Sequence, residues 1–273
     1  MPRDRDGIHA GVPAGCCIAA FAPREPARSV LRQTFPRRRA RLVLARSADE
    51  LDRVFRRELV DAVVVDVEHA TDEAWRAAAL AREFPSAPFF GVTAYRGADG
   101  PAVGRCADGD FADVLALGVD DIVMRELVLG DSFTARFARA LEAPPPTLHL
   151  TSPLQRESWS ALVAFAGRPV HTNVLAHALG LTREHLSRSF ATGGAPNLKR
   201  VVDLVRLLAA AELAKNPGYD VADVAAVLHF ASPSHLASTT RRLTGTKPVS
   251  LARLRAVDLI KRFSEGRGRS RRP

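Results

Sequence analysis

The sequence lacks the features of exported and membrane-spanning proteins. Its 273 residues include three cysteines, Cys16, Cys17 and Cys106, whose spacing suits neither a disulfide framework nor a metal site. No apolar run reaches the roughly 18 residues needed to cross a bilayer. The charged start, residues 1–6, has no signal-peptide core. We therefore expect a cytoplasmic protein.

Catalytic motifs are also missing. The sequence shows no Ser-His-Asp order, no Gly-rich phosphate loop and no paired acids, and His9, His69 and His149 have no recognisable partners. These absences disfavour an enzyme in residues 1–145 with a separate binding module attached. We expect no enzymatic activity, no cofactor and no bound metal.

The charge is divided unevenly along the chain. Residues 1–145 contain 20 Lys and Arg against 22 Asp and Glu, a net of −2, whereas residues 146–273 contain 19 against 8, a net of +11. A basic domain is attracted to phosphate, and neutralising phosphates releases counterions. The second half is therefore the candidate for binding nucleic acid, although a solvated basic surface would have the same composition.

Three consecutive prolines, residues 144–146, divide the chain and predict a stiff spacer. Before them, short apolar runs at 16–21, 42–45, 62–67, 89–93 and 119–124 alternate with helical stretches at 29–35, 48–59, 72–84, around 111–117 and 131–141. Buried strands that alternate with helices predict an α/β doubly wound, five-stranded parallel sheet. After the prolines, helical periodicity dominates and predicts an all-α domain.

Residues 173–190 have the pattern of a helix-turn-helix. A short helix ends at Gly180, which adopts a positive φ without steric cost. Thr182 is expected to cap a second helix. The apolar residues expected between the two helices are Val174, Leu175, Leu179, Leu186 and Phe190.

The pattern recurs at 221–243, where Ser232 is expected to cap the second helix and Pro233 occupies its first position. The residues expected to face inward there are Ala225, Leu236 and Leu243. A long helix at 198–215 lies between the two units and ends at the stop formed by residues 216–218.

At these residues the chain resembles the DNA-binding domain of AraC-type regulators. The resemblance covers about residues 172–254 and rests on the paired units, on the joining helix with Arg206, and on the stretches 230–236 and 244–248. It implies seven helices, with two recognition helices that read successive major-groove segments. The chain departs from the family at His229, where Gly is usual, and at Thr240, where a core aromatic is usual.

The family's base-facing positions correspond to residues in both units. They are Glu184, Ser187, Arg188, Ser234, His235 and Ser238. Four further basic residues are expected to contact DNA phosphates, namely Arg183, Arg241, Arg242 and Lys247. Double-stranded DNA is thus the expected partner, and a second copy of the chain and RNA polymerase are candidate partners.

The first half resembles a response-regulator receiver domain over about residues 16–141. Asp66 ends the expected third strand at the phosphoacceptor position, Thr93 matches the switch threonine, and residues 117–124 resemble the approach to the fifth strand. However, Phe21 and Ala22 stand where receivers place two metal-binding acids, and Arg125 stands at the lysine position. We expect a pseudo-receiver that serves interaction or dimerisation. The alternative is a phosphorylation-dependent response regulator with Asp66 as phosphoacceptor.

The expected organisation has five parts. They are a flexible N-terminus at 1–14, a receiver-like domain at 15–143, a proline-rich linker at 144–152, an AraC-type DNA-binding domain at 153–263, and a basic disordered tail at 264–273.

Overall fold

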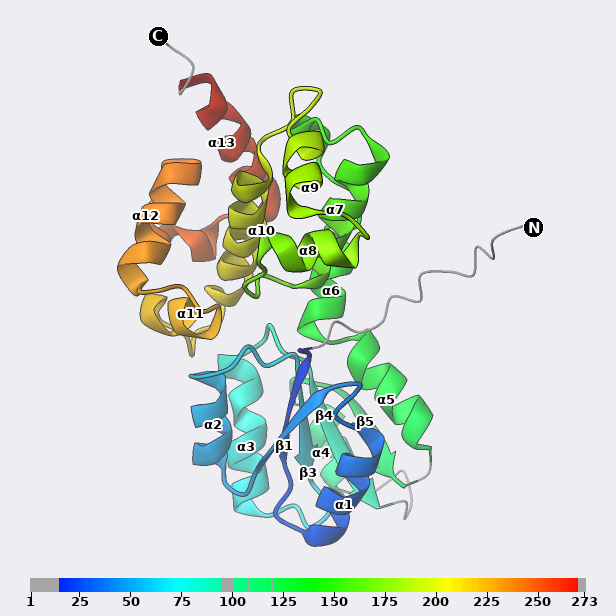
Figure 1. The fold of residues 1–273 in the computed structure, drawn as a ribbon. Helices are drawn as coiled ribbons and strands as arrows, with labels where there is room; N and C mark the ends of the chain where they lie inside the picture. Colours follow the sequence, from blue (N-terminus) through cyan, green and yellow to red (C-terminus); the bar gives the residue numbers. More distant parts are fainter. Residues whose placement is uncertain (1–14, 95–100, 108, 119, 270–273) are drawn as a thin grey trace, which may run out of the picture.

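The computed structural model describes residues 15–94, 101–107, 109–118 and 120–269. An α/β domain forms one end of the molecule and a helical domain forms the other, with helix α6 (Phe133–Ala140) leading from the first to the second (Figure 1). Residues 1–14, where we expected a flexible N-terminus, lie outside the described residues. In the described ranges, no helix combines the length and apolarity that crossing a bilayer requires.

The first domain is built on a parallel sheet of five strands in the order β2-β1-β3-β4-β5. The strands are β1 (Cys17–Phe21), β2 (Arg41–Ala45), β3 (Ala62–Asp66), β4 (Phe89–Ala94) and β5 (Phe111–Leu117). This order is one of the two common doubly wound arrangements and is the order found in receiver domains. The predicted fold class is therefore confirmed.

Helices cover both faces of this sheet. One face packs against α2 (Ala48–Phe55), α3 (Asp72–Glu83) and α4 (Pro101–Ala107), and the other packs against α1 (Glu25–Thr34) and α5 (Asp121–Gly130). Two hydrophobic clusters result, one on each side of the strands. Local capping fits these bounds, because Ser47 and Thr71 accept hydrogen bonds from the first turns of α2 and α3.

The prediction for the fifth strand was wrong. The strand is β5, in the stretch that we expected to be helical, and most of the predicted strand 119–124 belongs to helix α5. The error has a physical reason. As an edge strand with a single neighbour, β5 exposes Ala112 and Asp113 and so lacks the apolar run of a central strand. Asp120 caps α5 by accepting from the amides of Ile122 and Val123, and these two apolar side chains are exposed.

The proline-rich connection is packed rather than free. After α6 it forms a short 3-10 turn, η1 (Pro146–Leu148), and the side chains of Leu148 and Leu150 are buried in the core of the helical domain. The indole Nε1 of Trp159 donates to the carbonyl of Leu141 across 2.8 Å. The connection therefore fixes the start of the second domain.

The helical domain contains seven α-helices in the described part of the chain, as the resemblance implied. They are α7 (Pro153–Ala164), α8 (Thr172–Ala178), α9 (Arg183–Phe190), α10 (Leu198–Leu213), α11 (Val221–Val227), α12 (Pro233–Thr244) and α13 (Ala256–Arg269), with a 3-10 segment η2 (Pro248–Arg253) before the last. Helix α13 continues through residue 269. The expectation of disorder from residue 264 was therefore wrong up to that point, and residues 270–273 lie outside the described residues.

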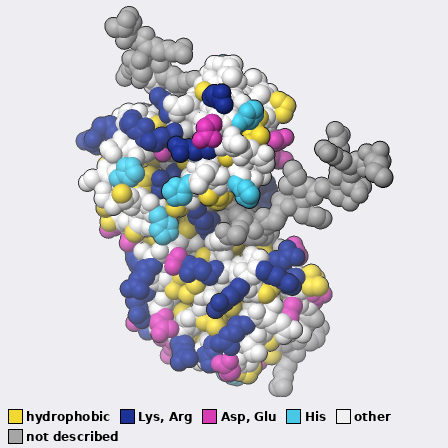
Figure 2. Space-filling view, viewed as in Figure 1, with side chains coloured by type: hydrophobic (Ala, Val, Ile, Leu, Met, Phe, Trp, Pro, Cys, Tyr) yellow, Lys and Arg dark blue, Asp and Glu magenta, His cyan; other side chains and the backbone are white. Residues whose placement is uncertain are grey.

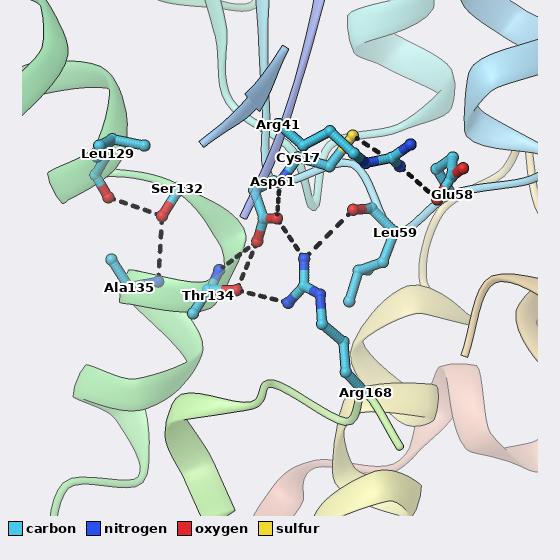
Figure 3. Close-up of polar contacts among 10 residues, drawn as sticks. All are labelled: Cys17, Arg41, Glu58, Leu59, Asp61, Leu129, Ser132, Thr134, Ala135 and Arg168. Carbon is cyan, nitrogen blue, oxygen red and sulfur yellow. Dashed lines mark hydrogen bonds and ion pairs between the residues drawn. The ribbon is translucent and has the colours of Figure 1, made fainter. Parts of the chain in front are cut away.

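A buried ion pair joins the two domains (Figure 3). Asp61, the residue before β3, is fully buried and binds the guanidinium of Arg168 from the loop between α7 and α8. Arg168 also donates to the hydroxyl of Thr134 across 2.9 Å. The same carboxylate accepts from the backbone amide of Cys17 at 2.7 Å and from the hydroxyl of Thr134 at 2.5 Å. Every oxygen of this buried carboxylate is thus satisfied.

A second contact is made by the loop between α10 and α11. The side chain of Asn216 bonds the backbone amide of Ser86 at 2.9 Å and its hydroxyl at 2.8 Å. A Cβ at Gly218 would lie 2.6 Å from the ring of Phe84, so only glycine fits there. Tyr219 stacks edge-on against the same ring and donates from its hydroxyl to the carbonyl of Phe55 at 3.0 Å. The predicted helix stop is therefore also part of the domain interface.

We expect Arg168→Ala to destabilise the full chain by about 3–5 kcal/mol, because it leaves the buried Asp61 carboxylate without its cation. Urea denaturation followed by circular dichroism measures this change. A matched control is Arg82→Ala, which removes an exposed ion pair with Asp110 and should cost at most about 1 kcal/mol. Equal losses in the two variants would contradict the assigned role of Arg168.

Candidate DNA interface

Helices α8 and α9 form the first helix-turn-helix unit. Gly180 in the turn has a φ of 67°, and the Thr182 hydroxyl caps α9 by accepting from the amide of His185. Leu186 and Phe190 of α9 are fully buried against the core. The opposite side of α9 is thereby left for solvent or a partner. One packing prediction was wrong: Val174 is 48% exposed, because Leu175 and Ala176 are the residues of α8 that face the core.

Helices α11 and α12 form the second unit. The Ser232 hydroxyl accepts from the amide of His235, and Pro233 occupies the first turn of α12, as predicted. Leu236 and Leu243 are buried, and so is Thr240. Thr240 fills its core position with a hydroxyl that donates to the carbonyl of Leu236 at 2.8 Å.

Arg206 of α10 braces the turn of this second unit. His229 adopts a φ of 52°, a left-handed conformation that costs a residue other than glycine some strain. The Arg206 guanidinium donates to the carbonyls of Leu228 at 2.9 Å and His229 at 3.2 Å. It also lies 4.1 Å from the ring centroid of Phe230, and burial lowers the pKa of Arg206. These contacts hold the turn in the absence of the family's glycine.

All ten residues expected at the DNA have exposed side chains. They are Arg183, Glu184, Ser187 and Arg188 on α9, Ser234, His235, Ser238, Arg241 and Arg242 on α12, and Lys247 after it. Figure 2 shows Lys and Arg side chains on one face of both domains, with histidines gathered over the helical domain.

Some of these side chains already have partners within the chain. Arg242 forms an ion pair with Asp203 of α10 at 2.8 Å. His235 accepts from the amide of Ala231 through Nδ1 at 3.4 Å, and its ring packs edge-on against Phe230. Within the described ranges, no ion pair engages Arg183, Arg188, Arg241 or Lys247 in this way. Free cationic side chains of this kind are available for phosphate or guanine.

The other candidate site, around Asp66 at the end of β3, is occupied by the chain itself. Arg24, the residue before α1, binds the buried Asp66 carboxylate through two bonds, Nε to Oδ2 at 2.8 Å and a terminal nitrogen to Oδ1 at 2.5 Å. Phe21 and Ala22 are buried and supply no metal ligands. A guanidinium therefore neutralises Asp66 where a receiver would use a metal ion.

Thr93, at the switch position, and Arg125 also bond to other parts of the chain. The hydroxyl of Thr93 donates to the Glu68 carboxylate at 2.5 Å, and the amide of Ala94 donates to the same oxygen. The hydrogen bond from Thr93 is the largest cause that lowers the pKa of Glu68. Arg125 was expected directly after the fifth strand, at the lysine position, and this assignment was wrong, because β5 ends at Leu117 and Arg125 lies within α5. Arg125 donates to the carbonyl of Thr34 at 3.2 Å. The structure thus groups Asp66 with Arg24 and Glu68, and Arg125 contacts a different element.

Sequence reasoning missed three arginines with defined roles: Arg24 at Asp66, Arg168 at the domain joint and Arg206 at the second turn. Each partner lies far along the chain, for example 42 residues away for Arg24 and Asp66. For Arg206, the His229 departure was a usable signal, because a strained turn needs compensation. For Arg24 and Arg168, no pattern of neighbouring residues predicts which aspartate each one binds.

A comparison with known protein families covers this part of the chain. Residues 175–253 match a family model described as a helix-turn-helix domain. The chain therefore carries an AraC-type helix-turn-helix domain and is a DNA-binding transcription regulator. The match begins within α8 and ends with η2, so it includes both units.

One solved structure, described as a low-resolution structure of the response regulator StyR, is similar to this chain. It is 16% identical and covers 70% of this chain and 98% of its own, with a TM-score of 0.38. No curated protein matches the chain significantly. The receiver-like fold of the first domain therefore rests on its own strand order.

We expect that acetyl phosphate with Mg²⁺ does not label this protein at Asp66. The carboxylate is held by Arg24, and the neighbouring strand end offers no acid to bind the metal ion. Incubation with radiolabelled acetyl phosphate, followed by gel analysis, measures the label, and Asp66→Asn provides the background. Label in the wild type that disappears in Asp66→Asn would contradict the pseudo-receiver interpretation.

Proposed function

We propose that this regulator reads a specific DNA sequence by placing α9 and α12 in successive major-groove segments. One observation carries the proposal: two capped helices each bury one side in a common core and expose a polar side rich in cations. A helix that is fixed on one side and polar on the other is suited to enter the major groove.

The two recognition helices differ in the chemistry that they present. On α9 we assign Arg188 to a guanine, whose N7 and O6 a guanidinium bonds together, and Glu184 to a cytosine, whose amino group donates to a carboxylate. On α12, Ser234, His235 and Ser238 are short or already oriented within the chain. We therefore assign most base discrimination to α9.

In this proposal the N-terminal domain contacts another protein surface. Its helix α5 exposes Ile122, Val123 and Leu127, by 63%, 51% and 45%, an apolar face suited to contact another protein surface. Dimerisation through this domain and contact with RNA polymerase stay predictions. Regulation by phosphorylation is less well supported, because Arg24 already neutralises Asp66.

Arg188→Ala should cost about 1–3 kcal/mol of binding free energy on the selected site and relax the preference at one base pair, because a bidentate guanine contact is lost. The site is obtained by selecting bound duplexes from random DNA with the full protein, and affinities are measured by fluorescence anisotropy. Lys215→Ala, just after α10 and next to the Asn216 contact between the domains, is a control with the same charge change. Equal losses on selected and random DNA would assign Arg188 to the backbone instead.

Arg241→Ala should weaken binding to the selected site and to random DNA alike, because a phosphate contact carries no sequence information. The slope of log K against log salt should fall in magnitude by about 1. Titrations at several salt concentrations measure it. An unchanged slope would rule out a phosphate contact for Arg241.

A further inference from the structure

The receiver-like domain carries a group of exposed arginines that no function described above uses. They are Arg37, Arg38 and Arg39 in the loop before β2, Arg53 near the end of α2 and Arg57 just after α2. We call these five residues the arginine surface. All five are exposed, and in the described part of the chain none of them forms an ion pair.

The two parts of the arginine surface lie at the same end of the sheet. Arg41, the first residue of β2, forms an ion pair with Glu58 at 2.5 Å, which brings the loop before β2 next to the segment after α2. The acids beside the surface are already engaged, since Glu58 binds Arg41 and Asp52 binds Arg56. The positive charge of the five arginines is therefore not cancelled locally.

This end of the sheet is the end that abuts the DNA-binding domain. Arg56, next to Arg57, binds Asp223 of α11 at 2.7 Å, and Phe55 accepts from Tyr219. In the register of the sheet, Arg41 pairs with Cys17, whose amide bonds the Asp61 of the domain joint. The arginine surface thus lies at the end of the first domain that contacts the second helix-turn-helix unit.

We propose that the arginine surface binds the phosphate backbone of DNA that flanks the sequence read by α9 and α12. The inference rests on the proposed function and extends the footprint of the protein onto its receiver-like domain. Arginines bind phosphate through paired N–H donors, and each neutralised phosphate adds to the salt dependence of binding. Such contacts add affinity without adding sequence preference.

The loop residues allow a clean test, because the loop before β2 is closed by backbone bonds from Arg39 and Ala40 to Pro36. The triple variant Arg37→Ala, Arg38→Ala, Arg39→Ala therefore keeps the bonds that shape the loop. A matched control removes three exposed arginines from elsewhere in the same domain, Arg76, Arg82 and Arg105. These three already have partners in Glu73, Asp110 and the ring of Trp75.

Binding of the full protein is measured on two duplexes that contain the selected site. The short duplex has roughly 20 bp, enough for two successive major-groove segments, and the long duplex has about 60 bp. On the long duplex we expect the triple variant to bind about ten-fold or more weakly than wild type, with a salt slope lower in magnitude by about 2–3. On the short duplex it should match wild type, and the control variant should match wild type on both.

Equal affinity and slope for wild type and the triple variant on the long duplex would overturn the proposal. An equal loss in the control variant would also overturn it, because net charge alone would then explain the effect. The proposed function has a separate test, since its failure appears as a lack of sequence preference of the wild type on the short duplex.

Discussion

The arrangement of this protein depends on one buried carboxylate, that of Asp61, which must keep a cation. The cation is supplied by Arg168, from the loop just before the first helix-turn-helix unit. A Cβ at Gly167 would collide with Ala209, so that loop follows a path open only to glycine. With the Asn216 contact before the second unit, the receiver-like domain contacts the chain next to both helix-turn-helix units from one end of its sheet. The orientation of each unit is therefore tied to the same rigid body.

The two ends of the sheet each hold a buried aspartate, and the two aspartates bind different arginines. At the carboxyl end, where receivers perform phosphoryl transfer, Arg24 closes the site by binding Asp66 through two bonds. At the amino end, Asp61 forms the joint to the DNA-binding domain. Both solutions pair a buried aspartate with an arginine, because an ionised carboxylate inside a protein needs a charge partner. Each end of the strands thus carries one buried aspartate–arginine pair.

The sequence predicted what local chemistry controls. The caps at Thr182 and Ser232, the positive φ at Gly180 and the alternation of buried strands with helices depend on neighbours along the chain. Partners that lie far apart in the sequence were not predicted, because nothing in the residues around Arg24 or Arg168 distinguishes them from exposed arginines. Strand β5 was missed for a related reason, because an edge strand carries a weaker hydrophobic pattern than a central one. Asp120, a capping residue before an apolar run, was the overlooked sign that a helix begins there.

The asymmetry between the two units follows from the same reasoning. The first turn contains Gly180, and α9 exposes Glu184 and Arg188, two charged groups of the kind that form strong, directional hydrogen bonds. The second turn contains His229 in a left-handed conformation, and Arg206 holds it by donating to the His229 carbonyl. This arginine is therefore engaged within the domain. Its helix presents hydroxyls and a histidine that already has an internal partner. The chemistry of the exposed side chains and the way each turn is held thus differ between the two units.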